Sequence, residues 1–434
     1  MGGNSTFCGG DQSWANACVG NNGSPSYVEY SKGFSTAANM LLDQVIDDGG
    51  IHLYVDELIY PICFNMRHSV ELRLKGAIDE LFEIAAIKGV SFVFDSATSH
   101  DIGIIWGAFK SESESLDSRY VSLNAKINQI ILDIASVDST GQTFRYPVSN
   151  ESQKHLAEVS IINIVVLKEK FAELEQSLDL LHRLNLWLRD EYQQGTHTSK
   201  LSRPMIYHLA MHLPPKNKWG DESFSETKSE IRAELNLSSN DLSKAIAKIT
   251  GHYYLASLVG VTIPLEGVAD DQLICFFDEW IKLHPDADGQ DNNDVAELGS
   301  QAMLQEIINS FAVEREIWDS LSARLTPKFL AGMKALFYFA RDKTFVEYYS
   351  VIYASYLKEL QFYFDKDVQG FKESFRHLIQ KTNALENVLI TLFALGNASL
   401  AELLIERYSF ASNYYWIEKA RSGELFGYPD FAGY

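Results

Sequence analysis

A long run of apolar residues constrains the fold of this 434-residue chain more than any other feature. Between residues 152 and 192, large apolar side chains recur at alternating steps of four and three, as on one face of a helix. They are Leu167, Phe171, Leu174, Leu178, Leu181 and Leu188. The sequence therefore predicts a long helix over 152–192. Its apolar face either packs in an ordinary bundle or forms a homodimer through residues 155–190.

Helical periodicity also runs through most of the remaining chain. Pro61 would kink one of the predicted helices or mark its true start. Strand-like alternation is confined to the short stretch 90–94. The chain is therefore expected to be all-α, a helical bundle followed by a second multi-helix region. The other predicted helices lie at 34–48, 53–88, 116–135, a pair within 222–260, and several between 296 and 408.

Composition divides the chain into four parts. Residues 1–33 are rich in Gly, Asn and Ser and are expected to form a flexible arm. A helical bundle is predicted over 34–195, where Gln-Gln-Gly closes the long helix. Prolines and polar residues mark 196–220 as an irregular connector, and 221–434 is expected to be a C-terminal helical domain.

The overall charge limits the partners that the chain can bind. The formal net charge is −21, which disfavours a broad basic face that binds nucleic acid. Net charge does not exclude a local basic cleft. The four cysteines have no metal-ligand spacing, and neither a signal peptide nor a membrane-length apolar run is recognisable. We therefore expect a cytoplasmic protein that does not enter a membrane.

Three short segments carry candidate functional residues. The first, Arg67-His68-Ser69-Val70-Glu71-Leu72-Arg73-Leu74-Lys75, lies within the predicted helix 53–88. On a helix its His68, Glu71 and Lys75 share one face, and Arg67 can pair with Glu71. The second segment is Ser99-His100-Asp101-Ile102, in which Asp101 can cap a helix. The third is Phe144-Arg145-Tyr146-Pro147.

In this order and spacing, the three segments resemble the HEPN domains of prokaryotic defence and toxin systems. The first is similar to the Glu–Leu–Lys stripe that packs this helix into a four-helix bundle. The second is similar to the family's His-Asp-Leu helix start, and the third to the Arg-Tyr-Pro segment of its nucleotidyltransferase-associated members. The resemblance covers about residues 34–195 and implies a bacterial effector, of antiviral defence or toxin type, with RNA or a nucleotide as partner.

The resemblance implies a cleft lined by Arg67, His68, Glu71, His100 and Arg145. The alternative interpretation of the same residues is a polar network between helices, with a helix cap. Spacing alone does not decide between these interpretations.

Ribonuclease members of the family use an Arg followed four to six residues later by a His. Paired across a dimer, the Arg stabilises phosphate charge while the His polarises the attacking 2′-hydroxyl. The one clean match here is Arg203-Pro204-Met205-Ile206-Tyr207-His208, which Pro204 interrupts and which lies beyond the predicted bundle. This departure from the pattern puts ribonuclease activity in doubt.

Other patterns indicate packing or solvated loops rather than chemistry. His208 and His212 are four apart but lack a third zinc ligand, and no phosphate-binding glycine motif is present. The acidic stretch 286–297 lacks the glycine that a calcium loop needs at its sixth place. The helix pair at 222–260 could read DNA through Lys244, Lys248 and His252, but its first helix is acidic. No cofactor or metal is therefore expected.

Two functions remain open from the sequence. The first is a dimeric, RNA-directed HEPN-like effector, which would be a ribonuclease if it is an enzyme. The second is a non-catalytic helical module that binds a protein or nucleotide partner, as the acidic surface and the missing catalytic motif within the bundle suggest.

Overall fold

The computed structural model describes residues 4–96, 98–148, 155–285, 300–410 and 415–434, without the side chains of 300–310. All regular structure in these residues is helical, and they contain no β-strand, so the all-α class is confirmed. The chain forms two compact units, residues 1–190 and 191–434. No helix of the described residues is long and apolar enough to cross a membrane.

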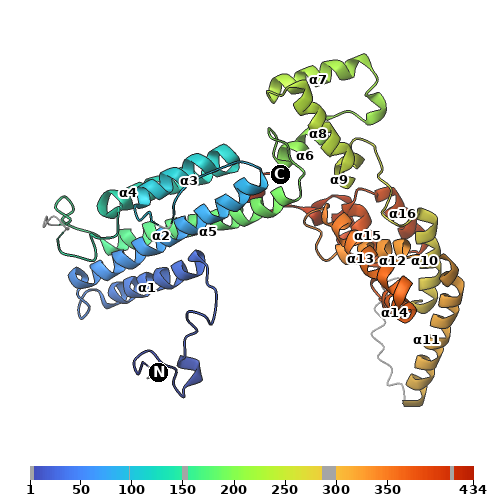
Figure 1. Cartoon of the computed structure of the whole chain (residues 1–434), viewed down its shortest axis with the longest axis horizontal. Coiled ribbons are helices and arrows are strands. Elements are labelled where there is room, and N and C mark those ends of the chain that lie inside the picture. Colours follow the sequence, from blue (N-terminus) through green and yellow to red (C-terminus); the bar gives the residue numbers. More distant parts are fainter. Residues whose placement is uncertain (1–3, 97, 149–154, 286–299, 411–414) are drawn as a thin grey trace. The chain divides into compact units, whose positions relative to one another are not determined.

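The described residues of unit 1 form five α-helices that run alongside one another (Figure 1). Its longest helices, α2 and α5, supply most of the apolar core, and α1 and α3 pack against α2. The bounds are α1 Tyr27–Asp48, α2 Val55–Ile87, α3 Ile102–Leu116, α4 Arg119–Asp138 and α5 Ile164–Gln193. Pro61 lies inside α2, which begins six residues before it at Val55.

Helix caps explain where the predicted bounds in unit 1 are wrong. α1 begins at Tyr27 rather than near residue 34, because Ser26 and Glu29 form a capping box. α5 begins at Ile164 rather than at residue 152, because the Asn163 side chain accepts hydrogen bonds from the first free backbone N–H groups. The stretch 90–94 forms no strand. The predicted cap of α3 is confirmed, since Asp101 accepts from the Ile104 N–H at 3.0 Å.

The apolar seam of α5 is buried within the chain. Five of its six residues are at most 4% exposed, namely Phe171, Leu174, Leu178, Leu181 and Leu188. A seam that is already covered by the chain's own helices presents no apolar face to a second copy. This burial favours the interpretation of α5 as an ordinary bundle helix.

Unit 2 contains twelve helices among its described residues. The predicted connector contains a regular helix, α6, with Pro204 in its first turn, where a missing N–H is harmless. The large core gathers around α12 and α15, and a second core forms between α6, α7, α8 and α9. The bounds are α6 Arg203–His212, α7 Glu222–Glu234, α8 Ser239–Gly251, α9 Tyr253–Leu258, α10 Asp270–Leu283, α11 Ser300–Leu321, α12 Pro327–Phe339, α13 Tyr348–Lys366, α14 Val368–Ile379, α15 Ala384–Ala394, α16 Ala398–Arg407 and α17 Tyr415–Arg421.

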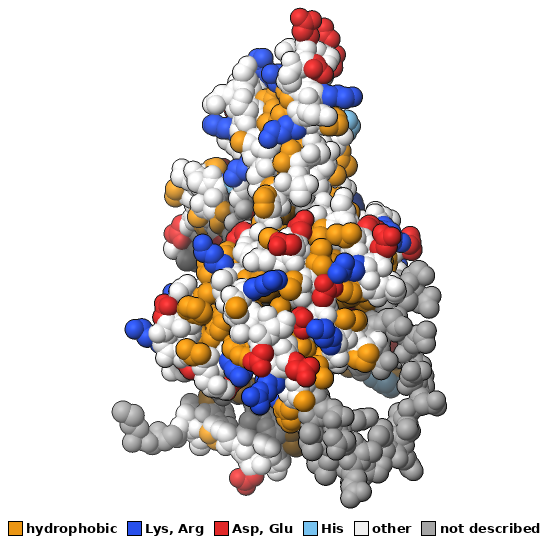
Figure 2. Space-filling view, turned by 90° about the vertical axis from the view of Figure 1, so that its right-hand side faces the viewer, with side chains coloured by type: hydrophobic (Ala, Val, Ile, Leu, Met, Phe, Trp, Pro, Cys, Tyr) orange, Lys and Arg blue, Asp and Glu red, His pale blue; other side chains and the backbone are white. Residues whose placement is uncertain are grey.

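Charged side chains are distributed without a broad basic area on the face shown in Figure 2, where acidic, basic and apolar groups are interspersed. This agrees with the net charge of −21. Any binding of an anion to this face therefore has to rely on a few local groups.

Candidate functional site

Glu71, on α2, is the centre of a polar cluster in unit 1. We call Arg67, His68, Glu71, Lys75 and His100 the Glu71 cluster. Arg67 and Lys75 lie one turn to either side of Glu71, and both form ion pairs with its carboxylate. The Nδ1 of His100 lies 2.9 Å from one carboxylate oxygen of Glu71, and the Nδ1 of His68 lies 3.8 Å from the other.

The guanidinium of Arg67 holds two backbone segments together through three carbonyl oxygens. It donates to the carbonyl oxygens of Asp138 and Ser139 at the end of α4, and to that of His100 before α3. Gly141 makes this approach feasible, because its φ is +79° and a Cβ there would lie 2.9 Å from Arg67 Nη1. Arg67 is only 3% exposed, so it acts as a structural clamp and cannot contact a substrate.

The two histidines form the solvent-facing edge of the Glu71 cluster. The side chain of His100 is 63% exposed and that of His68 is 30% exposed. His68 stacks on Phe64 with 5.8 Å between ring centroids, and the exposed Arg145 guanidinium lies 5.7 Å from the Phe64 centroid. The structure therefore brings together all five residues that the sequence placed in one cleft.

The electrostatics of the cluster keep Glu71 ionised. Burial by itself raises the pKa of Glu71, but the nearby imidazoles of His68 and His100 and the charge of Arg67 outweigh it. The pKa therefore lies well below its ordinary range. A permanent carboxylate of this kind fixes the tautomer of a bound imidazole, because it accepts the Nδ1–H and leaves Nε2 free to exchange a proton.

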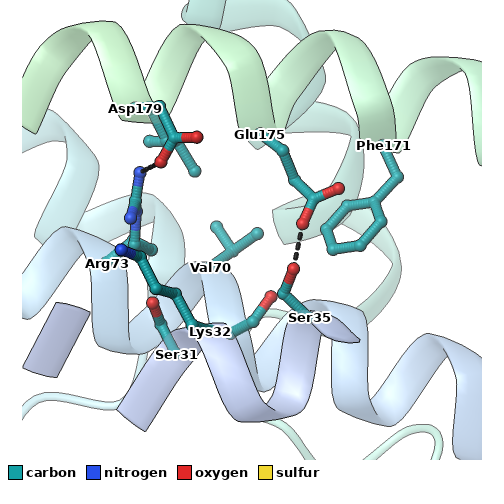
Figure 3. Close-up of a pocket in the computed structure, with 10 residues that line it drawn as sticks. Ser31, Lys32, Ser35, Val70, Arg73, Phe171, Glu175 and Asp179 are labelled. Atoms are coloured by element: carbon teal, nitrogen blue, oxygen red, sulfur yellow. Dashed lines mark hydrogen bonds and ion pairs between the residues drawn. The ribbon is translucent and has the colours of Figure 1, made fainter. Parts of the chain in front are cut away.

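A small pocket lies between α1, α2 and α5, outside the Glu71 cluster (Figure 3). Glu175 accepts hydrogen bonds from Ser35 and Asn39 on α1, and Arg73 on α2 pairs with Asp179 on α5. The pocket measures about 90 Å³, the volume of only about three water molecules. The hydrogen bonds of Glu175 and the Arg73–Asp179 ion pair hold the three helices together, and the space left between them is too small for an organic ligand.

The Arg203–His208 pair is not assembled as a catalytic pair. Arg203 is 1% exposed and forms a two-pronged ion pair with Glu347, whereas His208 is exposed on the same helix. Three tyrosine hydroxyls accept the remaining hydrogen bonds of the guanidinium. A guanidinium with every donor directed into the protein has none left for a phosphate.

Glu347 is the centre of a second polar cluster, which the sequence did not reveal. We call Thr196, Arg203, His252 and Glu347 the Glu347 cluster. Thr196 donates to the carboxylate at 2.5 Å, and the Nε2 of His252 lies 3.3 Å from it. Burial raises the pKa of Glu347, but the His252 hydrogen bond and the Arg203 charge outweigh burial and hold it well below its ordinary range. The partners lie far apart in sequence, so no local spacing could have predicted the cluster.

The remaining sequence patterns find little support as sites. His252 is 5% exposed and bonded within the Glu347 cluster, so the proposed DNA-reading face retains only Lys244 and Lys248. The side chain of His212 bonds the backbone carbonyl of His208. Among the described residues no group of three His, Cys, Asp or Glu side chains could hold a metal ion. The acidic stretch 286–297 falls within the residues that the structure does not describe.

Comparisons of the whole chain with protein-family models, with curated proteins and with solved structures found no match in any of the three.

Proposed function

We propose that this chain is a HEPN-like effector that acts on RNA through the exposed edge of the Glu71 cluster. The observation that carries the proposal is the pair of partly exposed histidines, His68 and His100, on one ionised carboxylate with Arg145 beside them. The resemblance of segments 67–75, 99–102 and 144–147 to HEPN domains supports the same assignment.

The chemistry of these groups suits cleavage of a phosphodiester by its own 2′-hydroxyl. One imidazole can take the proton of the hydroxyl while the other returns a proton to the departing 5′-oxygen. Arg145 can balance the charge that develops on the phosphate. Arg67 and Glu71 serve as positioning residues in this scheme, because both are buried and face the protein.

Local aromatic groups make single-stranded RNA the favoured form. Tyr146 is 50% exposed and lies under the Arg145 guanidinium, 5.5 Å from centroid to Cζ. An unpaired base can stack on such a ring while the arginine contacts the adjacent phosphate. A chain with a net charge of −21 gains little from the phosphates of a long duplex, so a few local contacts must provide the affinity.

The test is cleavage of a labelled single-stranded RNA by purified protein. We expect wild type to cleave and the His68→Ala, His100→Ala double variant to lose at least about 100-fold in rate. Arg145→Ala should weaken both binding and cleavage. Two matched controls should leave the rate unchanged: His182→Ala, which breaks another histidine–carboxylate pair of unit 1, and Arg183→Ala, which removes an exposed arginine.

Intact RNA with wild type, or unchanged cleavage by the double variant, would refute a nuclease at this edge. Because Arg203 is buried, His208→Ala should have no effect on cleavage. A loss of cleavage in His208→Ala would move the activity to α6 instead.

The second candidate is a non-catalytic binding module. The observation that favours it is the burial of Arg203, because the arginine of the one Arg–His match in the sequence cannot then reach a phosphate. This candidate predicts that the same RNA binds without being cleaved, and that Arg145→Ala abolishes the binding. Fluorescence anisotropy of the labelled RNA in the presence of the protein distinguishes the two candidates.

A further inference from the structure

Unit 2 contains an aromatic cavity that no part of the proposed RNA chemistry uses. Its volume is about 220 Å³, and its walls come from α6, α9, α15, the turn before α13 and the segment 423–434. Most lining groups are rings or aliphatic side chains, among them Tyr207, Tyr254, Phe426 and Met211. A concave, apolar pocket with a few polar groups is the usual form of a small-molecule site.

One wall of the cavity is rigid because the Glu347 cluster holds it. The hydroxyls of Tyr207, Tyr428 and Tyr434 accept hydrogen bonds from Arg203, and that of Tyr434 donates to Glu191 at 2.9 Å. Tyr428 and Tyr434 stack with 3.9 Å between centroids. Rings fixed in this way lose little entropy when a flat ligand packs on them.

Two basic residues are among the residues that line the cavity, Lys343 and His208. Lys343 is half-buried, and it forms no ion pair with any carboxylate of the described chain. A half-buried ammonium without a carboxylate partner, at the side of an aromatic cavity, is complementary to an anionic group on a ligand.

A second hollow adjoins the first and extends the space. It measures about 400 Å³ and shares Tyr254, Gly423 and Phe426 with the aromatic cavity. Its basic residue, Arg421, is already paired with Glu402 and Glu418. The unpaired positive charge is therefore that of Lys343, in the aromatic cavity. A larger ligand could extend past Phe426 into the second hollow.

We propose that this cavity binds a small planar aromatic anion, with its ring against Tyr254, Tyr207 and Phe426 and its anionic group on Lys343. Stacking on aromatic side chains does not discriminate strongly between flat rings. A nucleoside monophosphate and an aromatic carboxylate share this chemistry. The inference goes beyond the proposed RNA chemistry and does not depend on it.

The experiment is isothermal titration of the full chain with AMP, GMP, CMP, UMP and indole-3-carboxylate. Adenosine, which has the ring but no anionic group, and inorganic phosphate, which is an anion without a ring, serve as half-probes. We expect at least one aromatic anion to bind with a Kd below about 1 mM, and both half-probes to bind at least about tenfold more weakly. Comparing the nucleoside monophosphates with indole-3-carboxylate shows whether the cavity prefers a phosphate or a carboxylate.

Three variants locate the binding. Lys343→Gln should weaken it about tenfold, since a charge-assisted hydrogen bond is lost, and Lys343→Arg should restore most of it. Met211→Trp should block the cavity, because Met211 lines it and is 59% exposed, so that a larger side chain fits there without disturbing the core. Lys358→Gln, on the exposed face of α13, is the matched control and should bind as wild type.

Circular dichroism of each variant separates a binding defect from misfolding. The proposal is overturned if no aromatic anion binds in the millimolar range. It is equally overturned if binding persists unchanged in both Lys343→Gln and Met211→Trp.

Discussion

The two units each contain a largely buried carboxylate that holds an arginine and a histidine, yet the two histidines differ in their access to solvent. In unit 1 the histidine on Glu71 is His100, whose side chain is 63% exposed. In unit 2 the histidine on Glu347 is His252, whose side chain is 3% exposed. The same three residue types therefore form a solvent-facing acid–base edge in one unit and a sealed structural joint in the other.

The backbone environment explains this difference. Arg67 draws its remaining acceptors from three backbone carbonyl groups, two at the end of α4 and one before α3, so that no ring of the described residues covers His100. Arg203 draws its own from tyrosine hydroxyls, whose rings cover the cluster. Residue type alone does not indicate a functional site. What covers the ion pair decides whether its histidine can exchange a proton with a ligand.

The largest effect is expected from Glu347→Gln. The substitution leaves the Arg203 guanidinium charged and buried with only neutral hydroxyl partners, which destabilises the fold by about 3–5 kcal/mol. Urea unfolding followed by circular dichroism measures the loss. Asp278→Asn is the matched control, because it breaks the exposed pair with Arg407 and should change stability by at most about 1 kcal/mol. Equal losses in the two variants would contradict the sealed character of the Glu347 cluster.

Glu71→Gln should be less damaging, at about 2–3 kcal/mol, because three backbone carbonyls still accept from Arg67. The pH dependence follows from the lowered pKa of Glu71. The unfolded chain takes up a proton near the ordinary value of 4.5 while the folded chain does not, so stability is present above that pH and is lost as the pH falls below it.

Unfolding curves recorded between about pH 6 and pH 3 check this sign. Wild type should lose stability more steeply than Glu71→Gln as the pH falls, because the variant lacks the titrating carboxyl. A variant that retains the full acid slope would show that Glu71 does not supply it.

Gly141→Ala probes the approach of Arg67 to the end of α4. It should destabilise the fold by about 2–3 kcal/mol, because the left-handed φ costs about 1 kcal/mol and the new Cβ displaces the guanidinium. Gly89→Ala isolates the first contribution, since Gly89 has a φ of +68° and nothing within 4 Å of the added Cβ. If both substitutions lower the free energy of unfolding by the same amount, displacing the Arg67 guanidinium has no cost and its hydrogen bonds to the end of α4 do not stabilise the fold.

Patterns among residues close in sequence predicted the features of this structure that depend only on such residues. The all-α class, the helix over 53–88 and the cap at Asp101 follow from periodicity and side-chain chemistry within a few residues. The convergence of His68, His100 and Arg145 depends on how three separate segments pack. Spacing within each segment did not predict it, and the expectation of one cleft came from the resemblance of the three segments to HEPN domains. The start of α1 was misjudged because the Ser26–Glu29 capping box lies in a stretch whose composition indicated an arm.

The Glu347 cluster and the aromatic cavity could not be predicted in the same way. Their residues come from positions as distant as Thr196, Glu347 and Tyr434, and no local pattern links them. The sequence marked Arg203 only as part of the Arg203–His208 match, without the tyrosines that surround it. Only the fold shows that the tyrosines of the tail cover that arginine.

The smallest expected effect distinguishes the two histidines directly. His100→Ala should change the free energy of unfolding by less than about 1 kcal/mol, because an exposed histidine contributes little through its ion pair. His252→Ala should cost about 2 kcal/mol, since it removes a buried partner of Glu347 and the side chain that caps α9. Denaturation at pH 7 measures both. A His100→Ala loss as large as that of His252→Ala would mean that His100 is a structural joint as well, and the Glu71 cluster would then lose its claim to be the reactive one.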